Sequence, residues 1–235
     1  KHSKADWHVA HRPTPRELPA AGLHPLAPGA EPTDTVWSRW VAGGDSALAH
    51  LIPALPDRPV VLRPRHPLHV PRGRSALFFV NIPLWVRIQT GAPSATVLTE
   101  IPTIVLSKTW FGDPTSGELC YALKSKVLRR LEEVSNHPYT VTCPVSVENQ
   151  APSDLEFQRL CIHVEHLHVY RGQRRLWTNQ VEVAFKGEEL VSQITIRRYA
   201  PVFEQASERL CPARVPVDHS LLKKSFSFLR AITGF

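Results

Sequence analysis

The sequence predicts an all-β protein: an antiparallel β-sandwich with a proline-rich N-terminal arm and a C-terminal amphipathic helix. Proline makes up 22 of the 235 residues, and because it lacks the N–H that helices and ladders need, it favours short strands and many turns. From Pro59 onward, short runs rich in Val, Ile, Leu and aromatic residues lie between Pro and Gly. These runs recur at intervals of about 8 to 12 residues, a spacing typical of a sandwich or barrel.

Residues 1–57 are expected to form an arm or linker that contains a short helix. The stretch "RPTPRELPAAGLHPLAPGAEP" has no hydrophobic period, and its X-Pro pairs favour extended backbone. Trp37 and Trp40 lie three residues apart, a spacing that predicts a short helical turn. The composition changes near Asp57, which we take as the boundary of the arm.

Residues 58–213 are expected to form the sandwich. The runs "PVVLRP", "PLHVP", "SALFFVNIPLWVRIQT", "TIVLSKTWFG" and "GELCYALKSK" have strand composition. Further on, "LEFQRLCIHVEHLHVY" predicts one long strand, "RGQRR" a hairpin loop and "LWTNQVEVAF" the returning strand of an antiparallel meander. The intervening "LRRLEEVSNHP" fits a helical turn or a polar loop equally well.

Residues 214–235 are expected to form an amphipathic basic helix, because apolar residues recur there at a spacing of three to four. The apolar side consists of Leu222, Phe226, Leu229 and Ile232, and the basic side of Lys223, Lys224 and Arg230. Such a helix either caps an open face of the sandwich, or docks on an anionic membrane surface or in the groove of a protein partner.

Charge and apolar patterning predict a basic cytoplasmic protein without a transmembrane span. Lys and Arg number 28 against 21 Asp and Glu, so the net charge is 28 − 21 = +7, which suits an anionic partner as well as simple solubility. The apolar stretch "ALFFVNIPLWV" falls short of the roughly 20 residues that span a bilayer. The first residues lack the apolar core of a signal peptide. The four cysteines form no C-x-x-C pair, so we expect free, buried thiols in a reducing compartment.

The histidines of the predicted long strand suggest a metal site. Side chains alternate along a strand, so His166 and His168 would project from the same face. Two imidazoles placed in this way can chelate zinc or another divalent metal, provided that a third ligand is supplied from elsewhere. The candidates for this third ligand are His66, His69 and His137. The alternative is a polar stripe that faces solvent.

Arginines suggest an anion or nucleic-acid site at the predicted hairpin loop. Arg171, Arg174 and Arg175 lie close to Trp177, and arginine beside an exposed aromatic ring can combine phosphate contact with base stacking. Further arginines, including Arg63 and Arg65, bracket the first predicted strands. The sequence contains no G-x-G-x-x-G, no P-loop and no G-x-S-x-G, so no nucleotide motif or nucleophile motif indicates a reaction.

From Val60 onward the order of segments resembles the domain-of-unknown-function family numbered 432. The resemblance rests on "LFFVNIPLWVRIQTG", "LSKTWFGDPTSGELCYAL", "VSVENQAPSDLEFQRLCIHVEHLHVY" and "LWTNQVEVAF". It implies a prokaryotic protein with a β-sandwich and an accessory role in the cytosol; it assigns no residue a role, and residues 1–57 have no counterpart in it. We therefore expect a non-enzymatic module that binds a protein partner, with contact at the cytosolic membrane face. The alternatives are an anion or nucleic-acid binder and a metal-dependent enzyme.

Overall fold

The protein is nearly all β, as the sequence predicts. The computed structural model describes residues 2–3, 6–12, 27, 29–41, 48–91, 96–112, 114–124, 126–187 and 192–216. Over these residues it contains strands and three single-turn 3₁₀ helices but no α-helix, and most strand pairs are antiparallel. The sandwich arrangement stays a prediction. The predicted helical tail lies outside the described residues from residue 217 onward, and with it all seven of its candidate docking residues.

The first twelve strands are β1 (His2–Ser3), β2 (Asp6–Val9), β3 (Ser38–Val41), β4 (Ala49–Ala54), β5 (Val60–Leu62), β6 (Leu68–Val70), β7 (Ser75–Pro83), β8 (Trp85–Thr90), β9 (Thr96–Pro102), β10 (Lys108–Phe111), β11 (Glu118–Leu123) and β12 (Val127–Leu128). The remaining strands are β13 (Thr140–Asn149), β14 (Leu155–Phe157), β15 (Leu160–Ile162), β16 (Val169–Arg171), β17 (Leu176–Thr178), β18 (Val181–Phe185), β19 (Gln193–Ile196) and β20 (Glu208–Cys211). The 3₁₀ helices are η1 (Leu131–Glu133), η2 (Val164–His166) and η3 (Phe203–Gln205).

The chain divides into two compact units, of which the first comprises Lys1–Leu51 and Arg87–Ile101. In this unit β1, β2 and β3 form an antiparallel sheet. The prediction of a short helix at Trp37 and Trp40 is wrong, because Trp40 belongs to β3 and pairs across the ladder with Trp7. A cross-strand aromatic pair of this kind stabilises a sheet. An ion pair between Asp6 and Arg39 joins the same two strands, with 3.0 Å between Arg39 Nε and the carboxylate.

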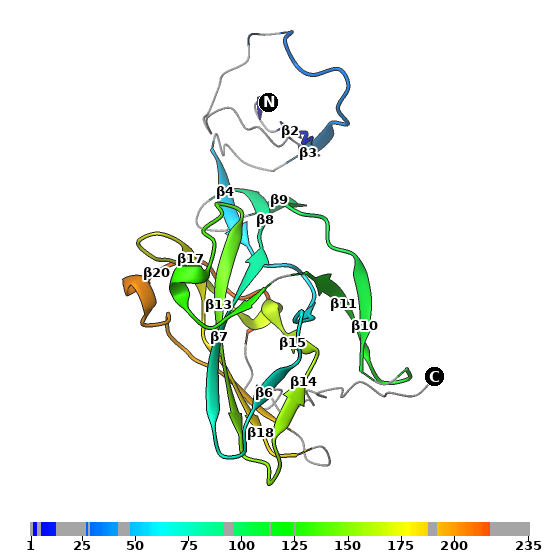
Figure 1. Ribbon diagram of the computed structural model, residues 1–235. Coiled ribbons are helices and arrows are strands. Elements are labelled where there is room, and N and C mark those ends of the chain that lie inside the picture. Colours follow the sequence, from blue (N-terminus) through cyan, green and yellow to red (C-terminus); the bar gives the residue numbers. More distant parts are fainter. Residues whose placement is uncertain are drawn as a thin grey trace. The chain divides into compact units, whose positions relative to one another are not determined.

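The second unit comprises Ile52–Val86 and Pro102–Phe235, and its largest sheet is built on β7 and β13. These two strands run side by side (Figure 1) and pair antiparallel from Thr140 opposite Pro83 to Glu148 opposite Ser75. Alternate side chains of both strands enter one apolar core, because successive residues of a strand point to opposite faces. The fully buried members include Val80, Ile82, Val141, Cys143 and Val145.

The predicted long strand from residue 155 to residue 170 is wrong, because the chain turns twice within it. It divides into β14, β15, the 3₁₀ helix η2 and β16. Two distant groups take the place of ladder partners: the side chain of Asn179 accepts the N–H of His168 at 2.7 Å, and the N–H of Val215 donates to the carbonyl of Glu165 at 3.0 Å. Backbone groups so satisfied need no neighbouring strand.

The hairpin predicted at "RGQRR" is confirmed, since β16 and β17 pair antiparallel with Arg171 opposite Leu176. The prediction of a simple antiparallel meander is wrong, because β17 and β18 both pair parallel to β13. The segment "LRRLEEVSNHP" contains the 3₁₀ helix η1, which resolves that choice in favour of a helical turn.

A smaller sheet in the order β10-β11-β5-β15 positions the candidate site. Strand β5 pairs parallel to β11 and antiparallel to β15, while β10 pairs antiparallel to β11. All four cysteines are free and buried, as expected from their spacing. Over the described part of the chain, no helix has the length and apolar character needed to traverse a bilayer.

Candidate functional site: a basic pocket

The parallel pairing of β5 with β11 brings two basic segments together. Leu62, the last residue of β5, lies opposite Leu123, the last residue of β11. Because parallel strands end at the same edge of a sheet, the residues that follow them, Arg63 and Lys124, emerge at one edge. Lys108 begins the antiparallel strand β10 opposite Tyr121, so it enters the sheet near this same edge.

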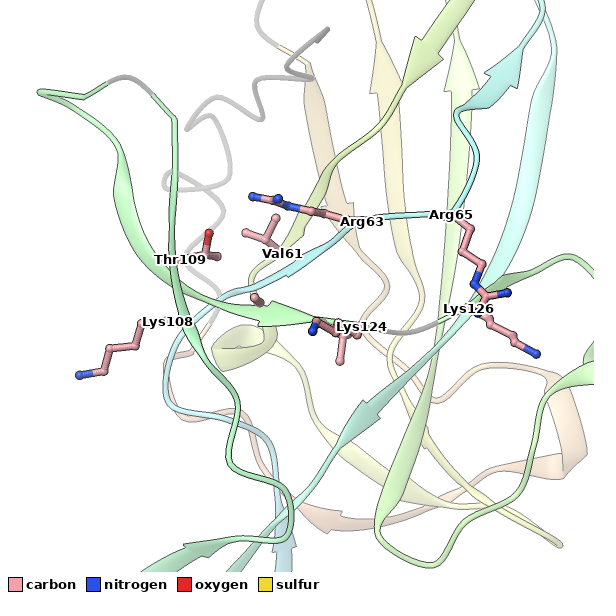
Figure 2. Close-up of a pocket in the computed structure, with 9 residues that line it drawn as sticks. Val61, Arg63, Arg65, Lys108, Thr109, Lys124 and Lys126 are labelled. Carbon is pink, nitrogen blue, oxygen red and sulfur yellow. The ribbon is translucent and has the colours of Figure 1, made fainter.

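A pocket of about 580 Å³ opens at this edge of the sheet. Among the described residues, its lining consists of Val61, Arg63, Arg65, Lys108, Thr109, Ala122, Leu123, Lys124 and Lys126, so five of these nine residues are cationic and none is acidic. Figure 2 shows Arg65 and Lys126 toward one end, Lys108 toward the other, and Arg63 and Lys124 between them. Val61 and Leu123 are buried and form an apolar base, whereas the five cationic residues are exposed.

Four of the five cationic residues of the pocket have no salt-bridge partner among the described residues. In the part of the chain that the structure describes, Arg63, Arg65, Lys108 and Lys124 form no ion pair. Arg159 adds a further positive charge nearby: burial first, and then the charge of Arg63, lower the pKa of its guanidinium. Its terminal nitrogen donates to the carbonyl of Trp110 at 2.8 Å, and its guanidinium lies 5.3 Å from the centre of the Phe111 ring. An anion in this pocket would therefore relieve repulsion among like charges.

The chemistry of the lining suits a small anion with several negative groups. Arginine binds phosphate or carboxylate through two parallel N–H donors, and lysine binds phosphate as a point charge. The volume lies within the range of about 300 to 1,000 Å³ that is usual for small-molecule sites. None of the described residues in the lining is aromatic, so these residues offer no surface on which a base could stack.

A second cavity, of about 470 Å³, differs from this pocket in its charge. Its lining includes Arg74 and Arg197 together with Glu148 and Glu182. Arg197 Nε lies 2.7 Å from a carboxylate oxygen of Glu182. The positive charge of the second cavity is therefore partly neutralised, and the first pocket is the better anion site.

The residues of the arginine loop, which is the predicted anion site, differ in their surroundings from what the sequence suggests. Stacking with a base would need an exposed Trp177 ring, but Trp177 is fully buried. Its ring stacks on Phe203, with 5.3 Å between ring centres. Arg175 Nε lies 3.0 Å from Glu204 Oε1, and both side chains are almost buried. Arg171 pairs with Glu208 at 3.3 Å, and Arg174 is exposed. The interpretation of Trp177 as a stacking platform is therefore wrong, and Arg175 is a structural residue.

The structure does not place His166 and His168 together on one strand face. His166 belongs to η2, whereas His168 follows it and accepts the N–H of Ala213 through Nδ1 at 2.8 Å. Among the described residues, two groups have ligand atoms that lie within 4.8 Å of one another, and both contain His163. One group is His163, Glu165 and His166, and the other is Glu118, Cys161 and His163. His168, His66, His69 and His137 belong to neither.

His163 lies between two carboxylates. Its Nδ1 is 2.9 Å from Glu165 Oε1 and its Nε2 is 3.2 Å from Glu118 Oε1. Burial disfavours the charged ring, but hydrogen bonds to Glu118 and Glu165 and the charges of these two residues outweigh it and raise the pKa of His163 to about 10. The ring is therefore an imidazolium at neutral pH unless another cation takes its place.

The sequence contains a local signal for the basic pocket. Arg63–Pro64–Arg65 lies at the end of one predicted strand, and the second pair of basic residues, Lys124 and Lys126, lies at the end of another. Arg63 and Arg65 bracket predicted strands, but nothing in the sequence pairs them with lysines about sixty residues away. This pairing depends on the parallel ladder between β5 and β11.

One family model matches the chain over residues 1–230, and its description is protein of unknown function, DUF432. The match confirms the resemblance and extends it, because it begins at residue 1 and includes the 57 residues for which the sequence suggested no counterpart. No curated protein and no solved structure matches the chain.

Proposed function

Since the chain belongs to the DUF432 family of proteins of unknown function, its function has to be inferred from its own geometry, and we propose that it is a binding module for a small anion with several phosphate groups. The anion would occupy the pocket at the ends of β5 and β11. The proposal retains the expectation of a binding module within a β-sandwich and assigns it no reaction. It moves the anion site from the arginine loop to this pocket.

A single observation carries the proposal: five cationic side chains surround one cavity, and none of the described residues that line it is acidic. Exposed cations are usually dispersed or paired with acids, because like charges that share a cavity repel one another. Arg63 and Arg65 supply planar donor pairs, while Lys108, Lys124 and Lys126 supply compact charges. A ligand with three linked phosphates would meet charge of opposite sign at both ends and in the middle of the pocket (Figure 2).

The expected energies follow from the exposure of these side chains. An exposed ion pair contributes about 0 to 1 kcal/mol, and a hydrogen bond to a charged group about 1.5 to 3 kcal/mol when water is excluded. For each side chain of this partly open pocket we take a contribution of about 1 kcal/mol to the binding free energy. Losing two of them should then weaken binding by about 2 kcal/mol, which corresponds to roughly thirtyfold in affinity.

Isothermal titration calorimetry of the full chain with inorganic triphosphate tests the proposal. The affinity should fall as salt is raised through about 0.1 M, where the screening length is about 10 Å. The variant R63A/K124A should lose affinity by roughly thirtyfold. Its matched control is R171A/R174A, which removes two exposed arginines of the hairpin loop and should change affinity by less than about twofold.

The outcomes separate three interpretations. Equal affinity for ATP and triphosphate supports recognition of the phosphate chain alone. Tight binding of an oligonucleotide with little binding of triphosphate would favour the nucleic-acid alternative. If affinity depends on Arg171 and Arg174 and not on Arg63 and Lys124, the pocket is the wrong site and the prediction from the loop is right.

The expected protein partner at the cytosolic membrane face is a separate proposal with its own evidence. It rests on the amphipathic pattern of residues 219–235, which lies outside the described residues. A membrane surface and a phosphorylated small molecule both offer phosphate groups. Anionic vesicles added to the calorimetric assay would reveal the first, and a variant that lacks the tail should lose vesicle binding while keeping triphosphate binding.

A further inference from the structure

The break in the predicted strand creates a cluster of metal-ligand types that the proposed anion pocket does not use. In an extended strand, residues two apart share a face, so His166 would have paired with His168. In the observed 3₁₀ turn, side chains three apart overlie one another. His163, which precedes η2, and His166, which ends it, therefore face the same side, with 6.2 Å between ring centres.

Glu165 lies between the two imidazoles. Its Oε1 is 2.9 Å from His163 Nδ1 and 3.9 Å from His166 Nε2. Tetrahedral coordination with bonds of about 2.0 to 2.1 Å places neighbouring ligand atoms about 3.3 Å apart. The observed distances lie on either side of this value, and the ligand atoms of all three residues lie within 4.8 Å of one another, so shifts of at most about 1.5 Å would bring them to a common ion.

The ring nitrogens that face away from the cluster are already held. His166 Nδ1 lies 3.0 Å from the carbonyl oxygen of Val215, to which it can donate a proton, and this leaves Nε2 with a free electron pair toward Glu165. His163 Nε2 lies 3.2 Å from Glu118 Oε1. Histidine ligands of metals typically donate their second N–H to a carboxylate or a backbone carbonyl, which fixes the tautomer and orients the ring.

The backbone fixes the turn to a distant segment. The N–H of Val215 donates to the carbonyl of Glu165 at 3.0 Å, while the carbonyl of Val215 can accept from Nδ1 of His166. Arg214, the preceding residue, donates through Nε to the carbonyl of Leu55 at 2.9 Å. The cluster is therefore preorganised by contacts from three parts of the chain.

An ion-pair network accounts for only part of this arrangement. Glu165 Oε1 has two imidazole neighbours, but Oε2 of the same carboxylate is buried and has no hydrogen-bond partner among the residues that the structure describes. A buried carboxylate oxygen without a partner carries a large desolvation penalty. Coordination of a cation by this carboxylate would supply the missing interaction.

We propose that His163 Nδ1, Glu165 and His166 Nε2 form a binding site for a divalent transition-metal ion, with Glu118 positioning the ring of His163. Two imidazoles and one carboxylate suit zinc and neighbouring first-row metals, whereas magnesium and calcium take oxygen ligands. The three side chains are 27%, 14% and 19% exposed, so solvent can complete the coordination. Binding displaces the proton between His163 Nδ1 and Glu165 to solvent, while the N–H at Nε2 continues to donate to Glu118.

Metal titration of the full chain, stripped with a chelator, tests this site. Zinc in competition with a chromophoric chelator should bind with a stoichiometry of one and raise the melting temperature. E165Q and H166Q preserve size and remove a ligand, so each should lower zinc affinity by more than about tenfold. E118Q should weaken it by about ten- to hundredfold, as expected for a residue that acts through a ligand.

Two matched controls separate this site from its neighbours. H168Q changes the histidine that lies outside the cluster, and C161S changes the thiol of the second group; both should leave zinc affinity within about threefold. Cobalt bound to the unaltered protein gives a readout that needs no variant. It should show visible bands of low-symmetry coordination without the near-ultraviolet band of thiolate ligation.

Three results would overturn the proposal. They are the absence of zinc and cobalt uptake by the unaltered protein, a thiolate band in the cobalt spectrum, and zinc binding that is lost in C161S but kept in E165Q. The second and third would move the ion to the group formed by Glu118, Cys161 and His163. Circular dichroism of each variant checks that its fold is retained.

Discussion

Glu204 is predicted to hold the hairpin loop that the sequence had suggested as an anion site. Its carboxylate accepts from Arg175 Nε at 3.0 Å, from the indole N–H of Trp177 at 3.3 Å and from the backbone N–H of Arg174 at 3.3 Å. The side chains of Glu204 and Arg175 are 13% and 11% exposed. Removing one partner of a buried pair leaves the other charge uncompensated and costs about 3 to 5 kcal/mol. We expect E204A to lose this much of its free energy of unfolding.

The backbone of Glu204 gives a second, smaller effect that can be measured separately. Its φ of 51° and ψ of 27° lie in the left-handed region, where a residue with a Cβ is disfavoured by about 1 to 2 kcal/mol. Glycine removes this strain but gains freedom in the unfolded chain. E204G should therefore be more stable than E204A by roughly 1 kcal/mol, although both lose the carboxylate.

Urea unfolding followed by tryptophan fluorescence and circular dichroism measures both effects. The matched control is E208A, because Glu208 pairs with Arg171 at 3.3 Å in the same region but with side chains 58% and 61% exposed. An exposed pair contributes little, so E208A should change stability by less than about 0.5 kcal/mol. If E204A loses under about 1 kcal/mol, or no more than E208A, Arg175 is not held by a buried pair and its assignment as a structural residue is refuted.

Three further predictions concern the core and the hairpin loop. N149A should lose about 3 kcal/mol in the same urea assay, because the buried amide makes three hydrogen bonds of 2.9 to 3.0 Å to backbone groups; a loss below about 1 kcal/mol contradicts this. G172A should lose about 1 to 3 kcal/mol, since an added Cβ would lie 2.7 Å from two atoms of the Trp177 ring, and an unchanged midpoint would show that the loop yields. Burial raises the pKa of Cys143 to about 12, so at pH 8 its thiol should escape a maleimide reagent until urea is added. Labelling of the folded protein at Cys143, detected by mass spectrometry, would contradict this prediction.

The sequence predicted those parts of the fold that depend on neighbours along the chain. The alternation of apolar residues in residues 75–90 and the Gly-containing loop after Tyr170 specify strands and a hairpin locally, and the structure contains β7, β8 and the pair β16–β17 there. The turns within residues 155–170 could not be predicted in this way. Their backbone partners, Asn179 and Val215, are supplied from elsewhere in the chain.

The candidate sites follow the same division. Basic residues after β5 and β11 are visible in the sequence, but only the parallel ladder shows that they line one pocket. For the histidines, the sequence identified the correct segment and the wrong partner. A change from extended backbone to one 3₁₀ turn replaces a spacing of two by a spacing of three, so His166 faces His163 and not His168.

The two proposed sites lie at opposite ends of one strand, which determines how they should interact. Glu118 begins β11 and Lys124 follows its last residue. At about 3.3 Å per residue, Lys124 lies about 20 Å from Glu118, whereas Lys108, opposite Tyr121, lies about 10 Å along the sheet from Glu118. The screening length at 0.1 M salt is also about 10 Å. A divalent ion beside His163 should therefore act on the pocket only weakly, mainly at its Lys108 end, and saturating zinc should change triphosphate affinity by less than about fivefold at that salt. A tenfold increase would mean either that zinc bridges protein and phosphate inside the pocket or that the sheet transmits a conformational change. The triphosphate affinity of E165Q with and without zinc then separates these causes, because only bridging in the pocket would persist in that variant.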